Sequence, residues 1–114
     1  MATTLVDIDT ESLRRKIDNG EEFILVDALS LISYAASHLP GAISMPPESV
    51  DGLAPRRIPD LGTEVVVYCA SPSCESSVAV AERLIELGYR NVLHYPGGKQ
   101  DWSKAGLPFE GGRV

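Results

Sequence analysis

Two apolar runs stand out in the pattern of hydrophobic and polar positions along the chain. They lie in residues 23–27 and 64–68, and the second is a row of valines that leads into Tyr68 and Cys69. A strand that is covered on both faces has no polar side, so these runs predict strands in the middle of a buried sheet. Shorter apolar runs predict further strands at 5–8, 43–45 and 92–95.

Helical patterns alternate with these strands. Leu13 and Ile17 lie four residues apart in a segment that starts after Asp9 or Thr10 and ends at Asn19-Gly20. Residues 48–62 contain Pro55 and Pro59, which predict a surface connection with one turn of helix. The other segments with helical patterns are 31–36, capped by Ser30, then 78–87 and 99–105. The alternation predicts an α/β fold with a mostly parallel sheet and helices on both faces.

Length and charge restrict the classes of protein to consider. A chain of 114 residues fits one domain, 1–114. The net charge of −6 argues against nucleic acid or an anionic membrane surface as a partner. Residues 1–4 carry no basic residue and no apolar stretch is long enough to cross a membrane, so we expect a cytoplasmic protein without a signal peptide.

The two cysteines, Cys69 and Cys74, are five positions apart in one loop. A disulfide framework joins distant segments, and a metal site needs more ligands nearby, so we expect neither a framework nor a metal. We also expect no cofactor. Thiol chemistry remains, with two small apolar residues as the alternative.

Cys69 stands where a strand gives way to a short loop and a helix. Ligands of parallel sheets bind beyond the carboxyl ends of the strands, and the dipole and free amides of a helix start lower the pKa of a thiol. Cys69 is therefore the candidate nucleophile. The residues expected to bind substrate through their backbone are Ala70, Ser71, Pro72, Ser73, Glu75 and Ser76.

The neighbours of Cys69 have more than one interpretation. Cys74 is a candidate resolving thiol, a second thiolate at the helix start, or a residue of the loop wall. Glu75 suits a helix start, but its charge would raise the pKa of a nearby thiol. Asp27 ends another strand at the same edge, either supporting the loop or capping the turn at 28–30. His38 is expected to bind backbone and lock a turn, and His94 to pack in the core.

Several segments together resemble the rhodanese-like (single-domain sulfurtransferase) family. These segments are Ile24–Asp27, His38–Ile43, Val65–Cys69, Gly88–Val92, Gly97-Gly98 with Trp102, and Ala105–Pro108. The resemblance implies a five-stranded, mainly parallel sheet. It also implies that Cys69 takes a sulfane sulfur from a donor as a persulfide and passes it to a thiol, cyanide or protein acceptor.

The active loop departs from the family pattern Cys-x-x-Gly-x-Arg. Pro72 stands at the glycine position, Cys74 at the arginine position, and Leu29 where a second arginine often follows the aspartate. We expect a thiosulfate-type or persulfide-type donor, and a neutral or protein-bound persulfide would need less positive charge. In this scheme Cys74 could capture Cys69 in a disulfide and release hydrosulfide.

Other functions stay open alongside the sulfurtransferase. One is a binding or regulatory module in which the cysteines are incidental, and another is a redox switch made of Cys69 and Cys74. A protein phosphatase is the weakest alternative, because Glu75 occupies the place, six positions after Cys69, where that chemistry needs an arginine.

Overall fold

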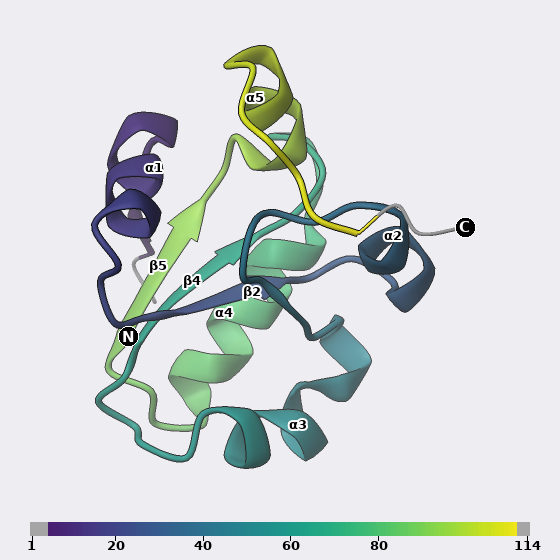
Figure 1. Ribbon diagram of the computed structural model, residues 1–114. Coiled ribbons are helices and arrows are strands. Elements are labelled where there is room, and N and C mark those ends of the chain that lie inside the picture. The colour runs from purple at the N-terminus through teal and green to yellow at the C-terminus, as the bar shows by residue number, and fades with distance from the viewer. Residues whose placement is uncertain (1–4, 112–114) are drawn as a thin grey trace.

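Five parallel strands form the centre of the computed structural model, which describes residues 5–111 (Figure 1). The spatial order is β1-β5-β4-β2-β3, and each neighbouring pair is parallel. The strands are β1 (Val6–Asp7), β2 (Ile24–Asp27), β3 (Ile43–Ser44), β4 (Glu64–Tyr68) and β5 (Asn91–Tyr95). The α/β fold with a five-stranded parallel sheet is confirmed.

The connections between the strands are mostly helical, as the crossovers of a parallel sheet require. The helices are α1 (Thr10–Asp18), α2 (Leu31–Ala36), a 3₁₀ turn η1 (Pro47–Ser49), α3 (Val50–Arg57), α4 (Ser76–Glu86) and α5 (Gly98–Lys104). Asp9 caps α1 by accepting from the Ser12 amide, and Ser30 caps α2 by accepting from the Ser33 amide. Both caps agree with the sequence-based expectation. α4 begins two residues earlier than its apolar run suggested.

The prediction for residues 48–62 was wrong. The segment contains η1 and two turns of α3, with Pro55 inside the helix. Proline removes one backbone hydrogen bond there, but Val50, Ala54 and Ile58 recur every four residues and are all buried. Burial of this apolar stripe offsets the cost of the proline and keeps the helix on the sheet.

The two faces of the sheet build two apolar layers. Val65 and Val67 of β4 face the layer that includes residues of α3 and α4, while Val66 and Tyr68 face the layer that includes Leu13 and Trp102. Figure 1 shows α3 and α4 on one side of the sheet and α1 and α5 on the other. The central strand β4 is thus covered on both faces, which explains its unbroken run of valines.

The carboxyl ends of the central strands meet at one edge, where the chemistry was expected. The register pairs Asp27 with Tyr68, so Asp27 lies beside the residue that precedes Cys69. Tyr68 also pairs with Tyr95, the last residue of β5. Within residues 5–111, no helix has the length and apolar character needed to cross a membrane.

Candidate functional site

Cys69 leaves β4 in a buried position and is held there by the start of α5. Its carbonyl oxygen accepts from the Lys99 amide at 3.1 Å, and the next carbonyl, of Ala70, accepts from the Gln100 amide at 2.8 Å. Only 2% of Cys69 is exposed. Two consecutive peptide groups beside the sulfur are therefore fixed by backbone hydrogen bonds, which hold the Cys69 backbone at a defined position.

Gly98 makes this close approach possible. Its φ of +60° is a left-handed conformation that glycine adopts without strain. A Cβ atom at this position would lie 2.4 Å from the carbonyl oxygen of Cys69. Any side chain here would push α5 and the cysteine loop apart.

The loop after Cys69 contains backbone donors that the fold leaves free. Its internal turn is closed by the Cys74 amide, which donates to the Ser71 carbonyl at 3.1 Å. In the described part of the chain, the amides of Ala70, Ser71 and Ser73 make no backbone hydrogen bond. The first amides of α4 are also without helical acceptors, as at every helix start. Such a group of donors suits an anionic sulfur atom.

Pro72 must be removed from the predicted amide donors. Proline has no backbone N–H, so it can shape the loop but cannot donate to a bound sulfur. Pro72 and Ser73 are exposed at the tip of the loop. The hydroxyl groups of Ser71 and Ser73 lie 3.1 Å apart and bond to each other.

The two cysteines are joined in a disulfide. Their Cα atoms are 6.2 Å apart, within the range that a disulfide spans. Cys74 is half-buried while Cys69 is almost fully enclosed. The loop thus brings the second thiol within bonding reach of the first.

Asp27 caps the turn at 28–30, one of the two roles considered for it, and the other, support of the cysteine loop, stays a prediction. One carboxylate oxygen accepts from the Leu29 amide at 2.8 Å and caps the turn after β2. The other accepts from the hydroxyl of Tyr68 at 2.8 Å, and the same hydroxyl accepts from the Leu39 amide at 3.0 Å. Burial and the nearby negative charge of Asp27 raise the pKa of Tyr68. This buried network ties the end of β4, one residue before Cys69, to two other segments.

The two histidines have structural contacts, as expected. His38 bonds through Nδ1 to the Tyr34 carbonyl at 2.8 Å and stacks on the Tyr34 ring. His94 is buried on β5, where Nε2 lies 2.8 Å from the hydroxyl of Ser77 in the first turn of α4. His94 thereby fixes the start of the helix that follows the cysteine loop.

The loop carries no positive side chain. Residues 70–76 contain one charged group, Glu75, and it is exposed. Lys99 follows β5 next to the loop, but its ammonium group donates to the Ser33 carbonyl of α2 at 3.1 Å. Binding of an anion at Cys69 would therefore depend mainly on backbone amides.

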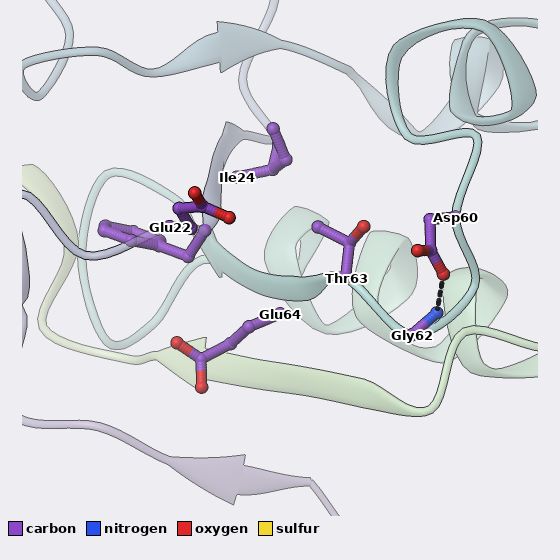
Figure 2. A pocket seen from close by; sticks show the side chains of 7 residues that line it. Glu22, Ile24, Asp60, Gly62, Thr63 and Glu64 are labelled. Atoms are coloured by element: carbon purple, nitrogen blue, oxygen red, sulfur yellow. Dashed lines mark hydrogen bonds between the residues drawn. The ribbon is translucent and has the colours of Figure 1, made fainter.

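An open pocket of about 610 Å³ lies at the amino ends of β2 and β4, opposite the end of the strands that carries Cys69 (Figure 2). Ile24 and Glu64, which begin β2 and β4, line it. Two of its carboxylates serve the local structure, since Asp60 accepts from the Gly62 amide at 2.8 Å and Glu64 binds Lys16. This pocket contains no cysteine, so we do not assign the thiol chemistry to it. Within residues 5–111, no three His, Cys, Asp or Glu side chains are grouped to hold a metal ion.

Sequence reasoning missed four residues that contribute to this site: Tyr68, Gly98, and Lys99 and Gln100 through their amides. Tyr68 lies in an apolar run, where a tyrosine reads as a packing residue. The sequence singles out Gly97-Gly98 only as part of the family resemblance, and Cys69, which Gly98 approaches, is 29 positions away in the chain. A glycine pair at the carboxyl edge of a parallel sheet was the signal that could have indicated close contact with another loop.

Comparisons with known proteins agree with this geometry. The chain is 32% identical over 104 residues to a sulfurtransferase of Allochromatium vinosum, with 90% of this chain and 92% of that protein covered. It is 34% identical over 87 residues to the thiosulfate sulfurtransferase GlpE of Haemophilus influenzae, covering 76% and 79% of the two chains. Two other curated relatives are longer, since the chain spans 53% and 50% of their lengths.

Solved structures show the same fold. The BH2092 protein of Bacillus halodurans superimposes with a TM-score of 0.87 and 28% identity, over 94% of this chain and 77% of that one. The family model of the Rhodanese-like domain matches residues 9–105, which include every strand from β2 to β5 and the whole cysteine loop. The chain belongs to the rhodanese-like family.

Proposed function

We propose that this protein is a sulfurtransferase that carries a sulfane sulfur as a persulfide on Cys69. The family match and the relatives named as sulfurtransferases support a sulfurtransferase-type function. The observation that carries the assignment to Cys69 is its place at the carboxyl end of β4, before a loop with free amides and the start of α4. Those donors favour a negatively charged sulfur over a protonated thiol.

The chemistry requires Cys69 in its reduced form. Its thiolate attacks the outer sulfur of the donor, the donor's sulfur–sulfur bond breaks, and the remainder of the donor leaves as an anion. With thiosulfate this leaving group is sulfite. An acceptor thiolate or cyanide then attacks the outer sulfur of the persulfide, and Cys69 returns as a thiolate.

The electrostatics of the loop support a preference among donors. Thiosulfate is a dianion, and the loop offers no positive side chain while Glu75 adds a negative one. A neutral or protein-bound persulfide needs less positive charge, so we infer that such donors load Cys69 faster than thiosulfate. Because the Haemophilus relative is named a thiosulfate sulfurtransferase, thiosulfate is also tested as a donor.

The test is the mass of the intact, fully reduced protein after incubation with thiosulfate or with a low-molecular-weight persulfide. We expect one added sulfur atom, located by peptide mapping on Cys69, and more rapid loading from the persulfide. Cys69→Ser should abolish loading at this residue while the fold is retained. Equal loading of wild type and Cys69→Ser would refute the assignment.

A binding or regulatory module is the second candidate. The observation that favours it is the absence of a cation in residues 70–76 together with Glu75. The two functions predict different reactivity for the Cys69 thiol. A carrier should show a Cys69 pKa well below the ordinary value of about 8.5 and rapid alkylation at neutral pH, whereas an incidental cysteine should show neither.

A further inference from the structure

We propose that Cys74 carries out a second step after sulfur transfer, in which the sulfane sulfur bound to Cys69 is reduced and released as hydrosulfide. In this step the Cys74 thiolate attacks Cys69 of the persulfide, and the disulfide seen in the structure is the product. The proposal rests on the proposed function, because it requires a persulfide on Cys69. It adds an activity to sulfur transfer: conversion of sulfane sulfur to hydrosulfide within one chain.

The geometry indicates which sulfur atom Cys74 attacks. A persulfide has an inner sulfur, which is the cysteine Sγ, and an outer sulfur. Attack on the outer atom would move the persulfide to Cys74, whereas attack on the inner atom forms a disulfide and expels hydrosulfide. The structure has a direct bond between the Sγ atoms of Cys69 and Cys74, so the loop allows Cys74 to reach the inner sulfur.

The loop also keeps the second thiol close. The hydrogen bond from the Cys74 amide to the Ser71 carbonyl closes a tight turn, and the Lys99 amide fixes the Cys69 peptide group. The attack is therefore intramolecular between two anchored groups, which gives it a high effective concentration relative to an external acceptor.

The step balances without any further reactant. The protonated Cys69 persulfide and the Cys74 thiolate give the Cys69–Cys74 disulfide and hydrosulfide: the bond between inner and outer sulfur breaks, the Sγ–Sγ bond forms, and the persulfide proton leaves with the outer sulfur as HS⁻. The sulfane sulfur gains two electrons, and the two cysteine sulfurs each supply one of them. A further turnover needs an external dithiol, which reduces the disulfide and is itself oxidised.

The exposure of the two cysteines sets the direction of that reduction. Cys69 is 2% exposed, whereas Cys74 is half-buried and nearer the solvent. An external dithiol therefore attacks the sulfur of Cys74, and Cys69 is the leaving group. Cys69 is released as the thiolate that the next donor requires.

The experiment follows a single turnover. Reduced wild-type protein, Cys74→Ser and Cys74→Ala are loaded with a low-molecular-weight persulfide, quickly desalted, and left without added thiol. Hydrosulfide is measured with a fluorescent alkylating trap, and the protein is followed by intact mass and peptide mapping. Ser103→Ala, on the exposed surface of α5, is the control for an unrelated substitution.

We expect wild type and Ser103→Ala to release about one hydrosulfide per loaded chain and to end as the disulfide. Both Cys74 variants should keep the added sulfur on Cys69 and release none. A wild-type persulfide on Cys69 as long-lived as that of Cys74→Ser would overturn the proposal and leave the carrier function intact. Transfer of the sulfur to Cys74 would also overturn it. No added sulfur in any variant would contradict the carrier function itself, and this proposal with it.

Discussion

Tyr68 shows how one buried hydroxyl group supports the position of the site without being part of the cysteine loop. It donates to the buried carboxylate of Asp27 and accepts from the Leu39 amide, and the tyrosine itself is fully buried. Polar groups at this depth have no water to replace a lost partner. The position of Cys69, the next residue, therefore depends on a hydrogen bond that takes no part in the proposed reaction.

The substitution Tyr68→Phe should lower the free energy of unfolding by about 1–3 kcal/mol, because it leaves the Asp27 carboxylate and the Leu39 amide without this partner. Urea unfolding followed by circular dichroism measures the loss. Tyr34→Phe is the matched control, since the Tyr34 hydroxyl makes one part-buried bond to the Ala42 carbonyl. We expect a smaller loss there, of about 1 kcal/mol. Equal losses in the two variants would argue against a special role for the Asp27 network.

At the residue scale, the sequence predicted the chemical role of a side chain more accurately than it predicted the residues that the side chain contacts. His38 was expected to bind backbone, and it does so through the Tyr34 carbonyl four residues away. Such local contacts follow from short spacing in the chain. The contact between Tyr68 and Leu39 spans 29 positions and depends on how β4 lies against the segment after α2, which no local pattern specifies.

Among the elements, α5 has the most direct effect on the cysteine loop. Its first residues supply the amides that bind the carbonyls of Cys69 and Ala70. Gly97-Gly98 and Trp102 were recognisable in the sequence as part of the family resemblance, but the sequence did not reveal that this segment contacts the cysteine loop. Helix and strand positions came from local periodicity, whereas only one turn of helix was predicted where α3 lies, because burial, not local preference, outweighs Pro55 there.

Two glycines of the α5 region test this contact. Gly98 and Gly106 both have positive φ, at 60° and 74°. A Cβ at Gly98 would meet the Cys69 carbonyl, whereas a Cβ at Gly106 would meet nothing within 4 Å. Gly98→Ala and Gly106→Ala should share the cost of left-handed backbone, about 1 kcal/mol. Only Gly98→Ala should also slow persulfide loading of Cys69, by at least about tenfold, through displacement of the loop.

The measurement is the rate of loading by intact mass, with unfolding free energies determined in parallel. If both variants load at the wild-type rate, the α5 contact does not position Cys69. If both slow equally, the effect comes from a general loss of stability and not from the contact.

At the scale of the whole molecule, buried tyrosines make the fold sensitive to alkali. Burial raises the pKa of Tyr68 and of Tyr95 above the ordinary value of about 10. The folded protein therefore keeps these protons at a pH where the unfolded chain loses them. The contribution of these buried tyrosines to the free energy of unfolding is fully present below pH about 10. It falls as pH rises above that value, by about 1.4 kcal/mol per pH unit for Tyr68 alone.

Alkaline titration tests this expectation. The ultraviolet absorbance of tyrosinate and the circular dichroism of the fold are recorded on the same samples. We expect the ionisation of the buried tyrosines to coincide with unfolding above pH about 10. Their ionisation in a protein that remains folded would contradict the assignment of Tyr68 as a buried, hydrogen-bonded group.

The lengths of the outermost strands have a consequence for association between copies of the chain. β1 and β3 lie at the two edges of the sheet and contain two residues each, while the valines of β4 lie in the third position, two strands from either edge. An edge strand is a template on which another molecule can add its own strand, and a very short one offers few free backbone groups. The order of the strands thus places the valine-rich β4 where a second copy of the chain cannot pair with its backbone.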